Sequence, residues 1–373
     1  MIIGIDGNEA NVINKVGISE YAFELLKQCE GFSRIQDVGF RIYLKEQPRD
    51  DLPKEKNSWK YRVVGPSRFW TQIGLPLDLY LHRTRPDIFF SPTHYAPRFS
   101  PIPTVISIMD VSYIYFPEMF KKSDLYQLRH WTVYSAKKAK KIFTISKASK
   151  NDIIRVYGVP EERVVVTYPG IKTPVTTNQL LNMEEMKKKY GINKDYILFV
   201  GTLQPRKNIV RLIEAFSKIE NKALDLIIVG KKGWLFEEIF AAPGRFGVEN
   251  SVKFLEFVSD SDLPLLYKHA TCFVLPSLYE GFGLPILEAM QYGCPVITSN
   301  VSSLPEAGGD AALYINPEDV GDIKDKINLL LDSKKLQKEL QEKGYKRVKK
   351  FSWEKTAQET LKVLQDVAFA PKT

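Results

Sequence analysis

Short apolar runs alternate with longer segments of mixed polarity along the whole chain. In the first half the apolar runs are "IIGID", "VGFRIYL", "DIFFS", "TVISIMD", "KIFTIS" and "RVVVTYPG". In the second half they are "YILFVG", "LDLIIVG", "VKFLEFV", "CFVLPS" and "PVITS". Runs of this length and β-branched content predict buried strands, and the segments between them predict helices. The alternation predicts an α/β protein built on parallel sheets.

A polar segment divides the two series of strands. It covers residues 171–193, and the chain of 373 residues is longer than a usual single domain. We therefore predict an N-terminal domain over residues 1–175 and a C-terminal domain over residues 176–350. The remainder, residues 351–373, reads as an amphipathic helix capped by Ser352. We expect it to cross between the domains and pack back on the first one.

Composition narrows the class of protein without naming a substrate. The formal net charge is +9, which favours acidic partners such as phosphate-bearing substrates, anionic lipid surfaces or nucleic acid. Three cysteines, an odd number without metal-ligand spacing, predict reduced thiols. The start "MIIGIDGNEA" lacks the features of a signal peptide, and no apolar run is long enough to span a bilayer. The sequence predicts a cytoplasmic protein.

The stretch "SLYEGFGLPILEAMQYG" contains a turn that is suited to an anion. Gly281, Phe282 and Gly283 precede Pro285, and proline favours the first turn of a helix. Free backbone N–H groups at a helix start bind phosphates, and the glycines permit close approach.

Two glutamates flank this turn. Glu280 precedes it, and Glu288 is expected in the first turn of the helix. A carboxylate beside a phosphate site can accept hydrogen bonds from sugar hydroxyls, as an acidic residue does in dinucleotide folds. Phosphate plus polyol suggests a sugar nucleotide. The alternative is that Glu280 ends a loop and Glu288 only complements the helix dipole.

The stretch "VGTLQPRKN" places cations at another strand end. Gly201 follows the apolar run, and Arg206 and Lys207 precede Asn208 at an expected helix start. Two fixed cations can face a diphosphate and stabilise the charge that grows on it as it departs. Solvated charges at a helix start are the alternative.

Several of these stretches together resemble a known family. "GTLQPRKNIVRLIEAF", "LPSLYEGFGLPILEAMQYGCPVITS" and "SSLPEAGGDAALYINPED" are similar to retaining glycosyltransferases of family 4, group 1, including bacterial mannosyltransferases and glucosyltransferases of glycan biosynthesis. The similarity continues through "VGISEYAFELL", "SPTHYAP", "VSYIYFPEMF" and "TISKASKNDIIRVYGVPEERVVVTYPG". It implies a GT-B fold of two Rossmann-like, doubly wound domains facing a central cleft.

The resemblance also implies roles for individual residues. Glu280 and Glu288 match the paired-glutamate motif, in which the first acid lies at the donor sugar and the second binds the ribose. Arg206 and Lys207 match the basic pair that holds the diphosphate without a metal or other cofactor, while the acceptor attacks from the leaving-group face with retention. The implied donor-binding set is Gly17, Gly201, Thr202, Gly230, Lys231, Phe257, Val258, Gly281, Phe282, Gly283, Leu284, Glu288 and Glu306. For Lys231 a solvated loop charge is the alternative, and for Glu306 a loop cap.

The first domain departs from the family pattern at two positions. Gly17 matches a glycine-rich loop, but Val16 replaces the other usual glycine, so a simple turn before a helix is an alternative. Met109 stands before Asp110 where many relatives have histidine. Asp110 is a candidate acceptor-side base, and His94 and Tyr113 are acceptor-side candidates, although a lone histidine is more often structural.

Asp260 and Asp262, in "SDSDLP", have the spacing of a metal-binding acidic motif. They precede a helical pattern and are expected to be cap and first-turn residues instead. The sequence predicts no metal site.

The stretch from Lys121 interleaves Tyr126, Trp131 and Tyr134 with basic residues, which is consistent with contact with an anionic membrane. Peripheral attachment to the inner face of the membrane is the hypothesis; core aromatics with solvated lysines are the alternative.

We therefore predict a metal-independent, retaining glycosyltransferase that moves a hexose, mannose or glucose, from GDP-mannose or a UDP-sugar to a glycan or lipid-linked acceptor. Alternatives are a sugar-nucleotide epimerase of the same fold and a non-catalytic glycan-binding homologue. Nucleic-acid binding is not expected, because no recognised motif accompanies the charge. The sequence leaves the donor, the acceptor and the oligomeric state open.

Overall fold

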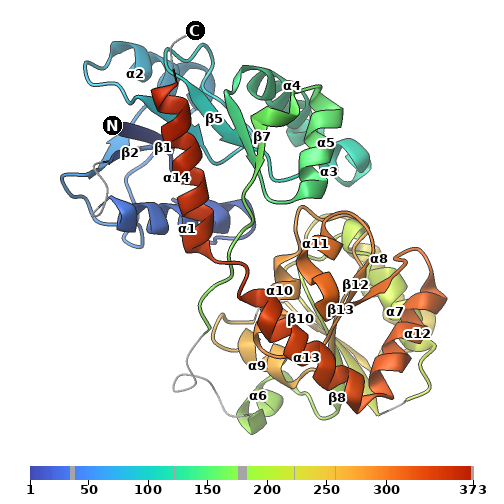
Figure 1. Ribbon diagram of the computed structural model, residues 1–373. Helices are drawn as coiled ribbons and strands as arrows, with labels where there is room; N and C mark the ends of the chain where they lie inside the picture. The colour runs from blue at the N-terminus through green and yellow to red at the C-terminus, as the bar shows by residue number, and fades with distance from the viewer. Residues whose placement is uncertain (34–37, 121, 175–182, 222, 257, 371–373) are drawn as a thin grey trace. The chain divides into compact units, whose positions relative to one another are not determined.

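The computed structural model describes the chain except residues 34–37, 121, 175–182, 222, 257 and 371–373 (Figure 1). Two compact units account for the described chain. Unit 1 comprises residues 1–114, 121–170 and 351–373, and unit 2 comprises residues 115–120 and 171–350. The short segment Tyr115–Phe120 thus belongs with unit 2, although it is flanked by unit 1.

Unit 1 is built on a parallel sheet of seven strands in the order β3-β2-β1-β4-β5-β6-β7. The strands are β1 (Ile2–Asp6), β2 (Gly39–Leu44), β3 (Trp59–Val63), β4 (Ile88–Ser91), β5 (Thr104–Ser107), β6 (Lys141–Thr144) and β7 (Val164–Val166). The helices are α1 (Ile18–Phe32), α2 (Leu75–Leu81), α3 (Ser112–Tyr115), α4 (Lys122–Lys138), α5 (Lys147–Tyr157) and α14 (Trp353–Phe369), with a π-helix η1 (Trp70–Gly74) and a 3₁₀ turn η3 (Glu161–Arg163).

Unit 2 is built on a parallel sheet of six strands in the order β10-β9-β8-β11-β12-β13. The strands are β8 (Asp195–Val200), β9 (Leu224–Val229), β10 (Val252–Leu255), β11 (Cys272–Leu275), β12 (Val296–Ser299) and β13 (Ala312–Ile315). The helices are α6 (Met183–Tyr190), α7 (Ile209–Ser217), α8 (Glu237–Phe246), α9 (Leu263–His269), α10 (Leu284–Gln291), α11 (Leu304–Gly308), α12 (Val320–Leu331) and α13 (Lys334–Val348), with 3₁₀ turns η2 (Pro117–Met119), η5 (Pro205–Lys207) and η6 (Gly309–Ala311).

Both sheets reverse their strand order beside the first strand of the unit. The reversal lies between β1 and β4 in unit 1 and between β8 and β11 in unit 2. In doubly wound sheets ligands bind at the carboxyl ends of the strands at this switch point. The α/β prediction is confirmed, and each of the eleven apolar runs contains a strand. The sequence analysis missed β3 and β13, which are edge strands with one neighbour each.

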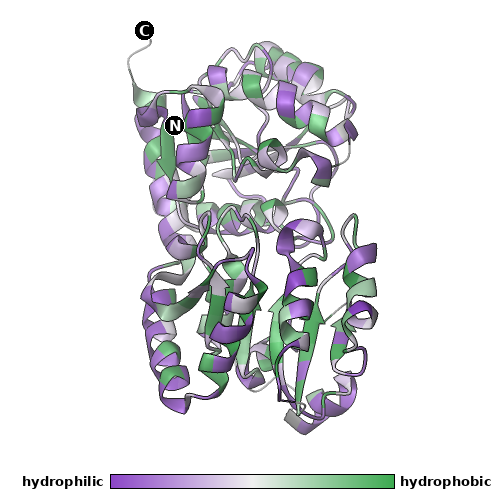
Figure 2. Ribbon diagram, turned by 90° about the vertical axis from the view of Figure 1, so that its right-hand side faces the viewer, coloured by the Kyte–Doolittle hydropathy of each residue, from purple (hydrophilic) through white to green (hydrophobic). Residues whose placement is uncertain are grey.

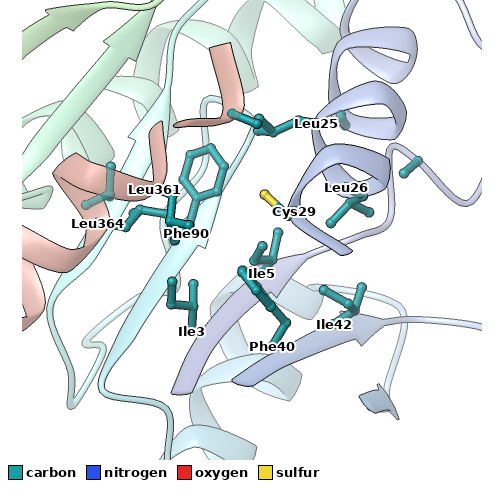
Figure 3. Packing of buried hydrophobic residues seen from close by; sticks show 14 of the residues in the cluster. Ile3, Ile5, Leu25, Leu26, Cys29, Phe40, Ile42, Phe90, Leu361 and Leu364 are labelled. Carbon is teal, nitrogen blue, oxygen red and sulfur yellow. The ribbon is translucent and has the colours of Figure 1, made fainter. Parts of the chain in front are cut away.

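The core of unit 1 lies between the sheet and the helices α1 and α14. Figure 3 shows Ile3, Ile5 and Phe90 of the sheet facing Leu25 of α1 and Leu361 of α14. Ser352 caps α14 as predicted, since its hydroxyl accepts a hydrogen bond from the Lys355 N–H at 3.2 Å. Figure 2 shows the same pattern by hydropathy, with hydrophobic strands and helices of mixed colour. Burial of one helix face against a sheet supplies most of a helix's stability in a protein.

The three cysteines, Cys29, Cys272 and Cys294, are free and buried. Burial raises the pKa of Cys29 and of Cys272 to about 12. They are inert core thiols at neutral pH. Among the described helices, none is both long and apolar enough to cross a lipid bilayer.

Candidate functional site

The basic loop after β8 is fixed by hydrogen bonds to two other strand-end loops of unit 2. Arg206 and Lys207 lie in η5, and Asn208 ends this turn with a φ of 60°. The Asn208 side-chain amide donates to the carbonyls of Pro276, at 3.0 Å, and Pro317, at 2.6 Å. These bonds join the loops after β8, β11 and β13, so the two cations have a defined position at the carboxyl edge of the sheet.

Glu280 forms ion pairs with both cations. Its Oε2 lies 3.1 Å from Arg206 Nη1, and its Oε1 lies 2.5 Å from Lys207 Nζ. The Ser277 hydroxyl donates to the same Oε1 at 2.7 Å. Arg206 also donates to the carbonyl of Tyr279. The structure therefore brings together the first predicted glutamate and the predicted basic pair.

The electrostatics of this cluster favour an ionised carboxylate. Burial alone would raise the pKa of Glu280, which is 7% exposed. The charges of Lys207 and Arg206 and the hydrogen bonds from Lys207 and Ser277 outweigh burial and lower this pKa to about 2. Glu280 is thus a permanent anion that orients two cations, and the trio carries one net positive charge for an anionic ligand.

Two serines after β12 hold the backbone of Glu280, and the sequence analysis did not select them. The hydroxyls of Ser302 and Ser303 donate to the Glu280 carbonyl at 2.6 and 2.7 Å. Ser302 adopts a left-handed φ of 57°, which brings its side chain to this carbonyl. Their place directly after an apolar run was the available signal, because strand ends of a parallel sheet meet at one edge.

The predicted anion turn leads into α10. Gly281, Phe282 and Gly283 are buried, and Gly283 has a φ of 107°, which favours glycine. A Cβ at Gly283 would lie 2.9 Å from Leu304 Cδ2, so this position also requires the small residue for packing. Leu284 is the first residue of the helix.

The predicted position of Glu288 in the first turn of α10 is wrong. Because the helix begins at Leu284, Glu288 is its fifth residue and lies beyond that turn. Its Oε2 accepts a hydrogen bond from the Tyr267 hydroxyl of α9 at 2.9 Å. Burial, together with the charge of Glu288, raises the pKa of Tyr267 well above its usual value, so the phenol stays a donor.

Gly201 and Gly230 meet at the ends of the neighbouring strands β8 and β9. A Cβ at Gly230 would lie 1.9 Å from the Gly201 carbonyl oxygen, so only glycine permits this approach. Leu203 N–H donates to the Lys231 carbonyl at 2.9 Å, which pairs the two loops. The side chains of Thr202 and Lys231 are exposed.

Three further predicted residues lie around the same sheet. Val258 is buried after β10, whereas Phe257 lies outside the described residues. Glu306 is in the first turn of α11, and its carbonyl accepts from the Arg347 guanidinium, which also donates to Ala307 O at 3.1 Å. Arg347 thus satisfies carbonyls near the end of this short helix.

The acidic pair before α9 takes part in ion pairs. Asp262 occupies the predicted N-cap position, but its carboxylate does not cap. It accepts instead from Lys189 Nζ at 2.5 Å and from the Tyr190 hydroxyl at 2.7 Å. Asp260 pairs with Lys172 at 3.4 Å. Within the described part of the chain, no group of three or more His, Cys, Asp or Glu residues is placed to hold a metal ion.

In unit 1, Gly17 is the N-cap residue of α1, with a φ of 57°. No atom lies within 4 Å of the Cβ that another residue would place there, and the adjacent Val16 is 61% exposed. The geometry is that of a turn before a helix in open space.

The candidate acceptor residues gather at the carboxyl ends of β4 and β5. The His94 ring lies 6.0 Å from the Tyr113 ring, and the Tyr113 hydroxyl is hydrogen-bonded to that of Tyr157. Asp110 Oδ1 accepts from the Ser112 N–H at 2.9 Å and acts on His94 through its charge. Burial outweighs that charge and lowers the pKa of His94 to about 4, so the imidazole is neutral at pH 7. Burial also raises the pKa of Tyr157 to about 12.

Met109, the residue at the family's histidine position, packs against the hydrophobic core of unit 1. The buried Nδ1 of His94 is without a hydrogen-bond partner among the described residues. His94 is therefore a polar group with unused hydrogen-bonding capacity at this edge, and it follows β4, whereas Met109 follows β5.

Asp6 is a further buried carboxylate at this edge that the sequence analysis missed. It ends β1 beside the switch point and is 6% exposed. Its Oδ1 accepts from the Asn8 side-chain amide at 2.6 Å and from the Asn8 N–H at 3.1 Å. Burial outweighs these bonds and raises the pKa of Asp6 to about 6. The string "IIGIDGN", an apolar run that ends in an acid, was the available signal.

The aromatic residues of α4 are divided between core and surface. Trp131 packs edge-on against Tyr95 at 5.8 Å, and the Tyr134 hydroxyl accepts from the Phe99 N–H at 2.9 Å. Tyr126 is 61% exposed and stacks on His130. Only Tyr126 of the three is mainly available to a membrane.

Unit 2 combines a sheet switch point with a basic pair, an ionised glutamate and a glycine-rich helix start, and the two doubly wound sheets together are those of the GT-B fold. Solved structures support this fold. WaaG, described as a glycosyltransferase involved in lipopolysaccharide biosynthesis, superposes with a TM-score of 0.72 at 17% identity, over 98% of this chain and 99% of that chain. Anabaena Alr3699/HepE in complex with UDP-glucose superposes with a TM-score of 0.73 at 19% identity, over 98% and 99% of the respective chains.

Sequence comparison identifies the family. The profile of glycosyl transferases group 1 matches residues 182–347, and that of glycosyltransferase family 4 matches residues 40–174. The O-antigen chain mannosyltransferase B of Escherichia coli is 31% identical over 363 residues, which cover 92% of this chain and 94% of that protein. The chain belongs to the group 1 glycosyltransferases and is a glycosyltransferase enzyme.

Proposed function

We propose that the protein transfers mannose from a nucleotide diphosphate sugar to a glycan or lipid-linked acceptor, with retention of configuration and without a metal ion. The observation that carries the proposal is the Arg206–Lys207–Glu280 cluster at the carboxyl edge of the unit 2 sheet. The choice of mannose is supported by the relative named as a mannosyltransferase. Retention is taken from the family resemblance.

In this proposal Arg206 and Lys207 bind the diphosphate of the donor. As the bond between the anomeric carbon and the diphosphate oxygen breaks, its electron pair passes to that oxygen. The two cations stabilise the developing charge. The acceptor hydroxyl forms the new glycosidic bond from the same face, and its proton passes to the departing diphosphate. The buried Glu280 keeps both cations in place, and its two serine contacts keep the peptide at Glu280 in place.

Glu288 is proposed to accept hydrogen bonds from the ribose of the donor. The phenol of Tyr267 fixes one carboxylate oxygen, which sets the orientation of the other. The amides of residues 281–284 are proposed to approach the sugar and phosphate. The nucleobase is proposed to contact the segment of Phe257 and Val258.

The acceptor is proposed to bind at the unit 1 edge that carries His94, Asp110 and Tyr113. A neutral imidazole with a free nitrogen can hydrogen-bond a sugar hydroxyl at pH 7. Replacing His94 with alanine is expected to raise the KM for the acceptor and leave donor binding unchanged. An unchanged acceptor KM would place the acceptor elsewhere.

The deciding experiment measures nucleoside diphosphate release over a panel of GDP-, UDP- and ADP-sugars, with and without EDTA and with candidate acceptors. GDP-mannose is expected to be turned over in EDTA, whereas turnover of a UDP-sugar that carries another hexose would overturn the choice of mannose. Arg206→Ala is expected to lower the rate by about 10²–10³. Lys218→Ala, which removes an exposed helix ion pair in the same unit, is the matched control and should keep full activity.

Product analysis separates the remaining alternatives. An epimerase would convert the donor without acceptor, and a glycan-binding homologue would bind sugar without turnover. Proton coupling constants of the product report retention or inversion. Loss of activity in EDTA that Mg²⁺ or Mn²⁺ restores would overturn metal independence. We also propose a peripheral position of the protein at the inner face of the membrane.

A further inference from the structure

The segment formed by η1 and α2 has apolar side chains on two faces. On the inner face Trp70, Leu75 and Leu79 are at most 2% exposed and pack in a cluster with Tyr43 and Phe89. The outward apolar side chains are Phe69, Ile73, Leu77, Tyr80 and Leu81, with exposed fractions of 49, 46, 52, 47 and 80%. Their spacing of three or four residues places them along one side of the helical segment.

A neighbouring loop extends this outward apolar face. The Arg98 N–H donates to the Thr71 carbonyl of η1 at 2.9 Å, which fixes the loop against the segment. The next residue, Phe99, is 72% exposed. The Arg98 guanidinium lies 4.9 Å from the centre of the Tyr134 ring, so a cation stands next to the exposed phenyl group.

A cavity of about 1110 Å³ adjoins the same loop, and one of its lining residues, Arg85, donates a hydrogen bond to the Tyr80 carbonyl near the end of α2. Its basic lining residues are Arg85, Lys138, Lys140 and Lys141, and its acidic ones are Asp87 and Asp366. Four cations against two carboxylates give the cavity lining a net positive charge, and Asp87 also accepts a hydrogen bond from the Ile2 N–H at 2.7 Å. Phe99 and several prolines supply apolar walls.

The cavity is separate from the candidate acceptor residues of unit 1. Its lining includes Arg85–Asp87 before β4, Pro101–Thr104 before and at the start of β5, and Lys140 before β6. These are the amino ends of three adjacent parallel strands. His94 and Asp110 follow the carboxyl ends, at the opposite edge of the sheet. The end of α14 also lines the cavity, and Figure 1 shows this end and α2 at the same end of unit 1.

We propose that this surface, the outward face of η1–α2 with Phe99 and the basic cavity, docks unit 1 on an anionic lipid bilayer. Apolar side chains can enter the boundary between headgroups and acyl chains, and lysine and arginine beside them can bind headgroup phosphates. This surface presents both kinds of side chain. Contiguous exposed apolar side chains mark interaction sites, whereas scattered ones do not. The four cations of the cavity favour a phosphate-rich surface over an apolar protein groove.

This assignment differs from the one that the sequence favoured on α4. Two of the three α4 aromatics contact the protein itself, as described above, whereas the η1–α2 face presents five outward apolar residues. From α4, Tyr134 and Lys138 contribute to the cavity lining. The inference does not depend on the transfer reaction, because neither the donor cluster nor His94 takes part.

Vesicle sedimentation of the full chain tests the proposal. The wild-type protein is expected to bind vesicles of phosphatidylcholine with 30% phosphatidylglycerol at least ~10-fold better than pure phosphatidylcholine vesicles, and to lose this preference as salt rises from 0.1 to 0.5 M. Leu77→Glu/Leu81→Glu and, separately, Lys138→Glu/Lys140→Glu are expected to lower the binding at least ~10-fold.

Matched controls place the same chemical changes on unit 2. Leu329→Glu alters an apolar residue that is 48% exposed, and Lys218→Glu alters an exposed lysine. Both controls should bind vesicles as the wild type does. Circular dichroism melting and nucleoside diphosphate release from the donor should be unchanged in the η1–α2 and cavity variants, which separates lipid binding from folding and from turnover.

The proposal is overturned if wild-type protein does not bind the anionic vesicles, or if the Leu77→Glu/Leu81→Glu protein binds them equally well. Sedimentation equilibrium measures whether the wild-type protein forms a dimer. A wild-type dimer that these two substitutions dissociate, without vesicle binding, would assign the face to a second copy of the chain instead.

Discussion

Two buried carboxylates, each beside the switch point of its own unit, have opposite electrostatic environments. Glu280 follows β11 beside the switch point of unit 2, and Asp6 ends β1 beside the switch point of unit 1. Burial would raise both pKa values, but two cations lower that of Glu280 to about 2, whereas that of Asp6 rises to about 6. The same sheet order thus supplies the place for a ligand, and the loops decide the chemistry there.

The candidate binding edges of the two units also differ in the side chains that they present. In unit 2 the polar groups are joined by ion pairs and hydrogen bonds into one preorganised cluster. In unit 1 the edge is aromatic, with a neutral His94 and a hydroxyl pair of Tyr113 and Tyr157. A cluster with fixed positive charge suits a diphosphate, and an aromatic edge with a neutral imidazole and carboxylates suits sugar hydroxyls. The following predictions test this contrast.

The largest expected effect comes from the strand-end glycine of unit 2. Gly230→Ala would bring a Cβ within 1.9 Å of the Gly201 carbonyl oxygen, so the two strands must separate. We expect a loss of more than about 4 kcal/mol in the free energy of unfolding, or no folded protein. Gly17→Ala in unit 1 meets no atom and should cost about 1–3 kcal/mol, from backbone strain alone, because φ is 57° and ψ is −116°. Thermal unfolding of both variants measures the two losses in stability. Similar losses for Gly230→Ala and Gly17→Ala would contradict the prediction.

Glu280→Gln should destabilise the protein at neutral pH by about 3 kcal/mol, because two partly buried cations lose their counter-ion. A lowered carboxyl pKa contributes stability above the unfolded value, 4.5, and this contribution is lost as pH falls towards 2. The stability difference between wild type and variant should therefore be constant above about pH 5 and shrink below it. Urea unfolding across this pH range measures it.

The matched control for that substitution is Glu339→Gln. Glu339 forms an exposed ion pair with Lys343 at 2.7 Å in α13. Solvent screens exposed pairs of this kind, so removal of this one should leave the free energy of unfolding almost unchanged. A loss in the control as large as that of Glu280→Gln would show that the buried cluster has no special role.

Asp6→Asn should stabilise the protein at neutral pH, which is the opposite of the effect expected for Glu280→Gln. A raised carboxyl pKa contributes stability below the unfolded value, 3.8, and this contribution is lost as pH rises through about 6. The wild type therefore loses up to about 3 kcal/mol between these values, whereas the neutral asparagine does not. The variant should be the more stable protein at pH 8 in urea unfolding. Asp51→Asn, at an exposed ion pair of the same unit, should give no such gain.

The smallest effect is expected from Tyr267→Phe, which removes the hydrogen bond to Glu288. The loss of one such bond is worth about 1 kcal/mol, so the KM for the donor should rise several-fold while kcat stays within about twofold. Tyr196→Phe is the control, because its buried hydroxyl donates to the Leu266 carbonyl. Equal KM values for the two variants would remove Glu288 from the donor site.

The local pattern of residues was enough to predict most strands of this protein, one helix cap and part of its candidate site. Buried strands of parallel sheets are apolar on both faces, so eleven strands were evident as short apolar runs, and helix caps such as Ser352 have their own residue preferences. The edge strands β7 and β10 were found in this way, but β3 was missed because Lys60 and Arg62 interrupt its apolar pattern, and β13 was missed as well. The basic pair and Glu280 were evident because each follows an apolar run.

The tertiary structure alone decided which side chains meet. The Ser302 hydroxyl contacts the Glu280 carbonyl, Tyr267 contacts Glu288, and Met109 packs into a core. These contacts join loops and helices that follow different strands. Sequence spacing cannot give them, because side-chain distance between separate loops follows from sheet order and not from chain position. The same reason applies to the outward face of η1–α2, since an apolar helix pattern does not reveal which residues the core leaves exposed.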